Sequence, residues 1–181
     1  MAYNDWTTVA ATNVNATTGI NFDEGAAPST VNDAARELMA QLKTALGTVS
    51  EGTFTPTLRG SATAGTQTYS YQVGAYRRVG NVVHFSVNIL LTAFDAATAG
   101  SLQIAGLPFT ARNTTNMNTP VAVGKWKFNI DAGYTCVVAE VTANSTVVQI
   151  GEGGDNVAIS NLIAANATND AQISVAGSYF V

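Results

Sequence analysis

Residues 81–91 read NVVHFSVNILL, and apolar side chains occupy every second position from Val83 onward. The apolar set consists of Val83, Phe85, Val87, Ile89 and Leu91. The polar set between them consists of His84, Ser86 and Asn88. Because successive side chains of a strand point to opposite faces, this alternation is typical of a strand with one buried face. The stretch predicts a β-strand that lines a hydrophobic core.

Other stretches that are typical of strands precede and follow this one. Tyr69, Tyr71 and Val73 alternate with polar residues and are expected on one face, and further candidate strands are residues 121–128, 134–141, 146–150 and 173–181. Turn signals separate them at Gly74, Gly80–Asn81, Asp131–Gly133, Ala143–Ser145 and Gly151–Asp155, and Gly106–Pro108 indicates a loop. Eight to ten short strands within residues 52–181 predict an antiparallel, jelly-roll-like β-sandwich head.

One helix is predicted ahead of this domain, within residues 26–47, AAPSTVNDAARELMAQLKTALG. Thr30 is the expected N-cap, with Asp33 three residues later accepting from the cap amide. Gly47 stands where a left-handed C-terminal cap belongs, and Lys43 near the end suits the helix dipole. We assign residues 26–50 to this amphipathic, coiled-coil-like segment.

The apolar positions of the helix follow the 4,3 spacing of a coiled-coil seam. They are Val31, Ala35, Leu38, Leu42, Ala45 and Val49. An isolated helix of this length is marginal in water, so the stripe needs a partner. An ordinary amphipathic helix packed on its own domain is one interpretation. We favour a short self-associating bundle, because few other apolar segments surround the helix in sequence.

Residues 1–25 are rich in Thr, Asn and Ala and show no clear periodicity. Trp6 and Phe22 are the apolar side chains available there for docking. We expect an extended arm whose aromatic residues bind another protein, because such anchors often order on binding. The alternative is that the arm folds back on the helix of its own chain.

Composition excludes several classes of function. Only 11% of the 181 residues are charged and the net charge is −4, so we expect no nucleic-acid binding through a basic face. No apolar run reaches 18 residues, so no membrane insertion is expected. Cys136 is the sole cysteine, which excludes an intrachain disulfide. The start of the chain lacks the pattern of a secretory signal, so synthesis in the cytoplasm is expected.

Charge divides the chain into three blocks. Residues 1–51 carry a net charge of −4, residues 52–127 of +5, and residues 128–181 of −5. Opposite charges in successive blocks suggest that the blocks meet, within one subunit or between subunits. Chance scatter among few charges is the alternative.

The N-terminal 43 residues resemble the attachment module of tail-fibre proteins of tailed bacteriophages. The resemblance rests on NDWTTVAATN and on GINFDEGAAPSTVNDAARELMAQLK. The matching positions are Trp6, Phe22, Glu24, Gly25, Pro28, Ser29, Val31, Asn32, Asp33, Ala34, Ala35, Arg36, Met39, Ala40 and Lys43. In that family the module attaches a fibre to the virion. The resemblance therefore implies a virion-docking role for Trp6, Phe22 and Glu24.

The rest of the chain is similar to a module of the same phage fibres. The matching positions are Phe54, Thr55, Pro56, Gly74, Tyr76, Arg78, Gly80 and Asn81, together with the ending ISVAGSYFV. The resemblance implies a homotrimer with β-sandwich heads, in which the seam residues of the helix form the trimer interface. It implies a virion protein whose partners are a phage tail or capsid protein and, as a candidate, a host-surface glycan.

Alternatives to a tail fibre are a capsid-bound decoration or head-fibre protein, a glycan-cleaving tail enzyme and a free lectin-like domain. We expect no enzymatic activity, cofactor or metal. His84 is the sole histidine and falls on a polar strand face, and no metalloprotease, P-loop or paired-cysteine motif is present. The acids Asp131, Glu140, Glu152, Asp155 and Asp170 show no spacing that pairs two of them in a pocket, and Gly151–Asn156 does not match an EF-hand.

Aromatic side chains are the expected glycan contacts, because sugars stack on their faces. Tyr69, Trp126 and Tyr134 are the candidate receptor contacts, and each of them is equally compatible with a place in the core. Trp126 shares its face with Phe128 and Ile130, opposite Lys125 and Lys127, which favours the core or a trimer interface for it.

Overall fold

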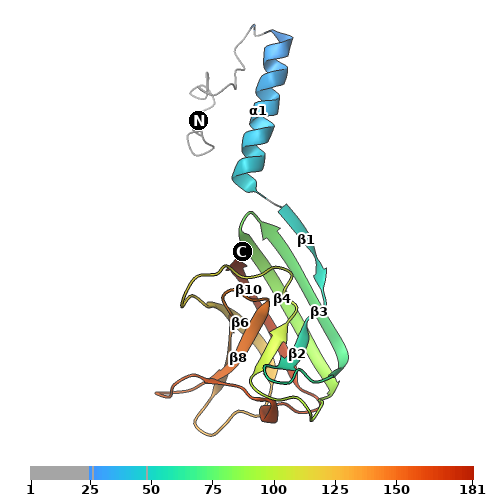
Figure 1. The fold of residues 1–181 in the computed structure, drawn as a ribbon, viewed down its shortest axis with the longest axis vertical. Helices are drawn as coiled ribbons and strands as arrows, with labels where there is room; N and C mark the ends of the chain where they lie inside the picture. The colour runs from blue at the N-terminus through green and yellow to red at the C-terminus, as the bar shows by residue number, and fades with distance from the viewer. Residues whose placement is uncertain (1–24, 26, 48) are drawn as a thin grey trace. The chain divides into compact units, whose positions relative to one another are not determined.

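The computed structural model describes residues 25, 27–47 and 49–181 of the chain. Its contacts divide the chain into two compact units, residues 1–49 and residues 50–181. The first unit contains the helix and the second contains the strands, apart from the first residue of β1 (Figure 1).

Helix α1 spans Pro28–Leu46, so a helix at this place is confirmed. The predicted N-cap is wrong: Ala27 precedes the first turn, no side chain caps it, and Thr30 lies within the helix. Pro28 explains the earlier start, because its fixed φ suits the first turn and its missing N–H is not needed there. The predicted C-cap is confirmed, since Gly47 has a φ of 62° and donates its N–H to the carbonyl oxygen of Lys43 at 2.9 Å.

Residues 50–181 form a curled antiparallel sheet, which confirms the predicted sandwich class. The strands are β1 (Val49–Phe54), β2 (Thr57–Gly60), β3 (Thr68–Val79), β4 (Val82–Ala93), β5 (Leu102–Ala105), β6 (Thr119–Lys127), β7 (Cys136–Val141), β8 (Val147–Gly153), β9 (Ser160–Asn161) and β10 (Gln172–Phe180). A short 3-10 helix, η3, spans Ala164–Asn166. The strands follow the order β1-β3-β4-β10-β6-β7-β8-β5-β2, with β9 beside β8.

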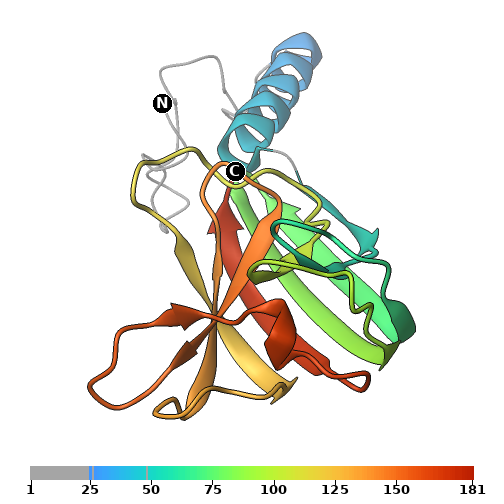
Figure 2. The ribbon, with the colours of Figure 1, turned by 60° about the horizontal axis from the view of Figure 1, so that its bottom comes forward.

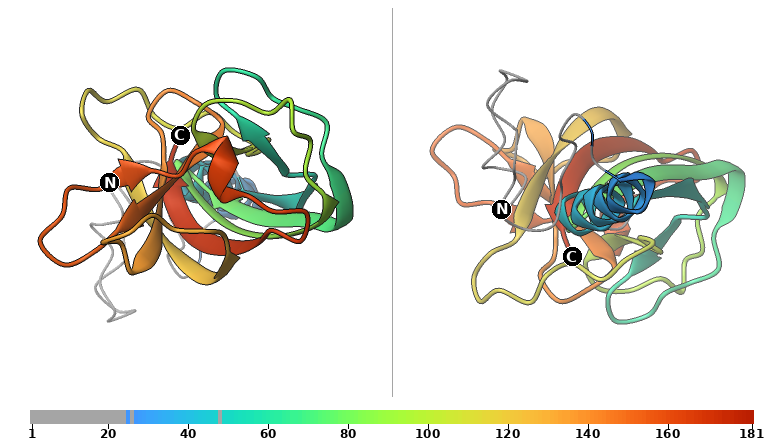
Figure 3. Two further views of the ribbon diagram at one scale, coloured as in Figure 1. Left: turned by 90° about the horizontal axis from the view of Figure 1, so that it is seen from below. Right: turned by 90° about the horizontal axis from the view of Figure 1, so that it is seen from above.

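Strand β6 joins the two halves of the curled sheet. Its residues 122–127 pair with β10, whereas its residues 119–121 pair with β7. A register shift opposite Ser174 and Val175 marks the bend. At the far ends of the strand order, β1 and β2 follow each other in the chain, separated by Thr55 and Pro56. The sheet therefore turns back on itself, and Figure 2 and the left view of Figure 3 show this curl.

The core fills the interior of this curled sheet, and β4 supplies one wall of it. All five apolar residues predicted for that face are buried, and the three polar residues between them are exposed. On the neighbouring strand β10, the ring of Tyr179 meets the ring of Phe85 edge-on at 5.6 Å. The Tyr179 hydroxyl donates to the carbonyl oxygen of Phe109 at 2.9 Å. The period-two pattern thus predicted both the strand and its buried face.

Strand β3 differs from its prediction because of a bulge. The register with β4 shifts between Tyr69 and Tyr71, which places one extra residue in β3. Tyr69 is half-buried, whereas Tyr71 and Val73 are exposed. The expectation that these three residues share one face is therefore wrong. A bulge reverses the alternation downstream of it, and the sequence pattern alone does not reveal the extra residue.

The predicted turn at Gly74 and the first part of the predicted turn at Gly151–Asp155 lie inside strands, whereas Asp155 is in a turn as predicted. Gly74 is buried in the middle of β3, and Gly151–Gly153 are the last residues of β8. Glu152, which falls within the predicted turn at Gly151–Asp155, is only 1% exposed. These glycines leave space for neighbouring side chains rather than making turns. The turn at Gly80–Asn81 is confirmed, with Gly80 at a φ of 58° between β3 and β4.

One ion pair joins the basic and the second acidic block of the chain. Lys127 at the end of β6 contacts the carboxylate of Asp170, which precedes β10. Both side chains are exposed, so the pair contributes little to stability. It agrees with the expectation that the oppositely charged blocks meet, here within one chain.

Candidate functional site

The apolar stripe of α1 is a candidate assembly surface. Val31 is 41% exposed, and Ala35, Leu38 and Leu42 are half-buried. Beside the stripe, Met39 is 69% exposed. Val49 is the first residue of β1, so it lies beyond the helix and the helical spacing ends before it. The side chain of Ala45 and the docking candidates Trp6, Phe22 and Glu24 lie outside the described residues.

Polar side chains of α1 make local contacts within the helix. Arg36 and Asp33 form an exposed ion pair at 3.6 Å, and Gln41 donates to the Glu37 carboxylate at 3.1 Å. Such pairs support a helix by only a few tenths of a kcal/mol, about 0.2–0.5 each. They do not replace the burial of the apolar stripe as a source of stability.

Tyr69 is tied into the fold through its hydroxyl. The Leu58 N–H donates to the Tyr69 oxygen at 3.0 Å, and that hydroxyl donates to the Leu58 carbonyl at 3.3 Å. Burial raises the pKa of the Tyr69 phenol above 10.0, and the bond from the Leu58 backbone partly offsets this. Its polar end therefore joins β3 to β2, and only part of the ring reaches solvent.

Trp126 and Tyr134 come from other places in the fold. Trp126 pairs with Ile173 on the inward side of the sheet, yet it remains 38% exposed near the end of β6. Tyr134 is half-buried in the loop between β6 and β7. Two strands, β4 and β10, separate β3 from β6 in the sheet, so Tyr69 and Trp126 are not on neighbouring strands. The candidate aromatic residues thus come from separate elements.

The residues that carry the fibre-module resemblance pack against one another. The ring of Phe54 lies on Gly74, and the ring of Tyr76 lies on Gly52. Tyr76 meets Phe109 edge-on at 5.3 Å. Arg78 stacks over the Phe109 ring at 4.9 Å and donates to the Gly80 carbonyl at 2.8 Å. These motif residues join β1, β3 and the loop after β5, so their role in this chain is to hold the fold.

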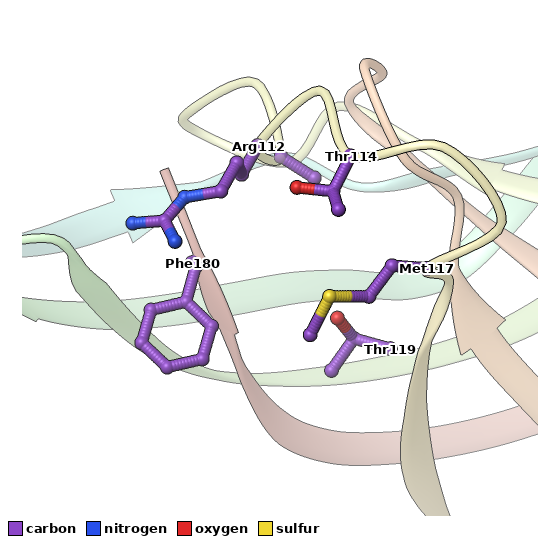
Figure 4. A pocket seen from close by; sticks show the side chains of 6 residues that line it. Arg112, Thr114, Met117, Thr119 and Phe180 are labelled. Atoms are coloured by element: carbon purple, nitrogen blue, oxygen red, sulfur yellow. The ribbon is translucent and has the colours of Figure 1, made fainter.

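A hollow between the loop 106–118 and the end of β10 is a candidate ligand site that the sequence reasoning missed. It measures about 50 Å³ and is lined by Ala111, Arg112, Thr114, Met117, Thr119 and Phe180. The Arg112 guanidinium lies over the Phe180 ring at 5.1 Å from its centroid. Figure 4 shows Thr114 and Met117 turned toward the same space. No local motif marks it, because strand pairing brings distant residues together.

A second, wider hollow lies on the outer surface of β7, β8 and β9. It measures about 390 Å³ and is lined by Pro120, Val138, Ala139, Glu140, Gln149, Gly151, Ile159 and Asn161. Pairing places Pro120, Glu140 and Gln149 in one row across three strands. Asn118 donates to the Glu140 carboxylate at 2.7 Å. The surface offers amide and carboxylate groups beside small apolar side chains.

The carboxylates of Asp131 and Glu152 both accept hydrogen bonds that join separate segments of the chain. The backbone N–H of Asp131 donates to the buried Glu152 carboxylate at 2.9 Å. Asn166 donates to the Asp131 carboxylate at 3.1 Å and to the Asn129 carbonyl at 2.7 Å. These bonds hold the turn after β6 against β8 and η3.

Within residues 25, 27–47 and 49–181, no three His, Cys, Asp or Glu side chains gather closely enough to hold a metal ion. The described part of the chain also forms no helix with the length and apolarity needed to cross a membrane.

Comparison with known proteins gives a likeness of fold. No protein-family model matches the chain, and no curated protein matches it. Among solved structures, it is similar to the Dettilon tailspike protein (gp208), with a TM-score of 0.60 and 21% sequence identity. The likeness covers 73% of this chain and 24% of that chain. This chain thus shares its fold with about a quarter of a tailspike.

Proposed function

We propose that this chain is a structural protein of a bacteriophage virion, a small homotrimeric tail fibre. Residues 1–25 attach it to the particle, α1 joins three copies, and residues 52–181 present a β-sandwich head to the host surface. The proposal includes no catalytic role. A phage tail context is supported by the tailspike with the same fold and by the fibre-like residues of the N-terminal module.

The observation that carries the proposal is the apolar stripe of α1. A helix of 19 residues spans about 28 Å and is marginal on its own in water. None of the described seam residues on the helix, Val31, Ala35, Leu38 and Leu42, is fully buried. Burying a Leu or Val side chain stabilises by about 1.5–3 kcal/mol, and three copies of the stripe provide that burial for one another.

The host-facing part of the proposal rests on the surface of the head. Apolar groups line both hollows, together with two threonine hydroxyls in the smaller one and the amides of Gln149 and Asn161 in the wider one. Such groups suit carbohydrate, which presents hydroxyls and apolar ring faces together. Weak binding by each head is sufficient, because several heads on one particle act together.

The oligomeric state tests the proposal directly. Analytical ultracentrifugation of the full chain at micromolar concentration should give three times the 18.7 kDa chain mass. A monomer with a cooperative melt would contradict the proposed trimer. Antibody labelling of intact particles then tests the location: label at the tail supports a tail fibre, and label on the capsid supports a decoration protein instead.

The absence of catalysis has its own test. The purified full chain is incubated with host polysaccharide, and reducing ends are measured over time. No new reducing ends are expected. A steady increase would replace the fibre proposal with a glycan-cleaving enzyme.

A further inference from the structure

The hollow beside Arg112 has the composition of a subsite for an anionic group. In the described part of the chain, no carboxylate lies within ion-pair distance of the Arg112 guanidinium. The guanidinium carbon lies 5.1 Å from the Phe180 ring centroid, and its N–H groups make no hydrogen bond within the described residues, so these donors are available to a ligand. We propose that this hollow binds the carboxylate of an acidic sugar residue. This inference rests on the proposed host-glycan binding and names the ligand class.

The size of the hollow selects a small group. A volume of about 50 Å³ admits a few water-sized groups, which is enough for a carboxylate and too little for a sugar ring. The hydroxyls of Thr114 and Thr119 line it and make no hydrogen bond within the described residues. They are free to bond to the carboxylate or to the neighbouring ring hydroxyl.

The rim of the hollow suits the rest of the sugar. Met117 is 52% exposed and Phe180 is 45% exposed, on opposite sides of the opening (Figure 4). An apolar ring face of a pyranose packs well on such side chains. The ligand therefore places its carboxylate against Arg112 and its ring against Met117 or Phe180.

The charge of the hollow favours a carboxylate over a phosphate. Arg112 is the one charged side chain among its lining residues. One guanidinium offers two parallel N–H bonds, which match the two oxygens and the single negative charge of a carboxylate. A phosphate monoester carries nearly two negative charges at neutral pH and leaves about one of them without a partner here.

Backbone bonds hold this arrangement before any ligand binds. The Arg112 N–H donates to the Phe180 carbonyl at 2.7 Å, and the Arg112 carbonyl accepts from the Thr114 N–H at 3.1 Å. The Met117 N–H donates to the Thr114 carbonyl at 3.2 Å. The last strand thus fixes the loop that carries the guanidinium, which lowers the ordering cost of binding.

The test measures binding of three matched probes to the full chain by saturation-transfer NMR. They are methyl β-D-glucuronide, methyl β-D-glucoside and glucose 6-phosphate. We expect the glucuronide to bind with a dissociation constant on the order of 1 mM and the other two at least about tenfold more weakly, as a single-site contact of this size allows. Equal binding of glucuronide and glucoside, no glucuronide binding, or tighter binding of the phosphate would each overturn the inference.

Matched variants locate the binding. Arg112→Gln should weaken glucuronide binding about tenfold or more, because a charge-assisted bidentate bond is lost. Arg77→Gln removes the same charge from an exposed position on β3 and should leave binding unchanged. Unchanged binding by Arg112→Gln would contradict the assignment. The mass of each sample is measured alongside, so failure to bind by an intact trimer rejects this site and leaves the fibre proposal standing.

Discussion

The aromatic ring of Phe54 lies against the backbone of Gly74, and a β-carbon at Gly74 would stand 2.6 Å from the Cζ atom of that ring. Phe54 ends β1, and Gly74 lies in the middle of its neighbour β3. A glycine at this place lets an aromatic side chain of one strand cover the backbone of the next. Two residues that resemble a fibre motif in sequence are therefore a packing pair in space.

Gly74→Ala should destabilise the head. The added methyl group cannot fit beside Phe54 without a shift of the ring or of β3, so we expect a loss of about 1–3 kcal/mol in the free energy of unfolding. Gly124→Ala is the matched control, because its new β-carbon meets only Ser174 atoms at 3.7 Å or more. Thermal melts of both variants and of the unmodified chain measure the change in melting temperature. Equal melting temperatures for Gly74→Ala and the unmodified chain would contradict this packing.

If the proposed trimer forms through α1, Leu38→Asp or Leu42→Asp should convert it to monomers. Either change places an unpaired charge in the proposed seam, where its desolvation is not compensated. Ala40→Asp introduces the same residue at an exposed position off the stripe and should keep the trimer. Light scattering measures the molecular mass of each variant in solution. A trimer that persists in both seam variants would mean that the heads alone hold the assembly.

Trp6→Ala should reduce incorporation into the virion and leave the head intact. A large aromatic side chain is a typical binding anchor, and its removal commonly costs about 2 kcal/mol or more of binding energy. Incorporation is measured by quantifying the protein on purified particles. The melting temperature of the head is the control. A lower melting temperature would place Trp6 in the fold of the protein rather than in its attachment.

The stability of the head should fall at high pH because of Tyr179. Burial raises the pKa of this phenol to about 12, from 10.0 for an exposed tyrosine, although the positive charge of Arg78 partly offsets the rise. The folded state thus favours the protonated phenol. The contribution of Tyr179 to the free energy of unfolding is therefore complete below about pH 10, and it is lost as the pH rises through about 12.

Tyr179→Phe isolates this contribution. The variant lacks the titrating group, so its free energy of unfolding should depend less on pH between 10 and 12 than that of the unmodified chain. Denaturant titrations at several pH values measure the difference, and lysine titration affects both proteins alike. Parallel pH profiles would show that Tyr179 does not titrate in this range.

Tyr69→Phe separates the two roles considered for Tyr69. The change removes the oxygen that accepts the Leu58 N–H, and an unsatisfied backbone group costs about 1–3 kcal/mol. We expect lower stability with little change in binding to host cells, because the ring that sugars stack on is retained. Reduced cell binding at unchanged stability would assign the hydroxyl to the receptor contact instead.

Local patterns in the sequence determined the helix, most strands and the buried face of β4. The spacing of apolar residues, every second residue in a strand and about every 3.6 residues in a helix, depends only on backbone geometry. It can therefore be recognised in the sequence without knowing which element packs against that face. The Gly47 cap and the Gly80–Asn81 turn were predictable for the same reason, because each requires a backbone conformation that glycine adopts easily. The predicted N-cap, Thr30, lies three residues after the observed one, Ala27, since Pro28 acts within the first turn rather than before it.

Only the tertiary structure decided the faces of β3 and the candidate ligand site. The bulge after Tyr69 reverses the alternation, and its position depends on the register with β4. Gly74 signals a turn in isolation and becomes a packing surface only when Phe54 is beside it. Arg112 and Phe180 meet because β10 ends where the loop after β5 passes. Such contacts depend on which strands pair, and strand pairing is a property of the whole chain rather than of any short segment.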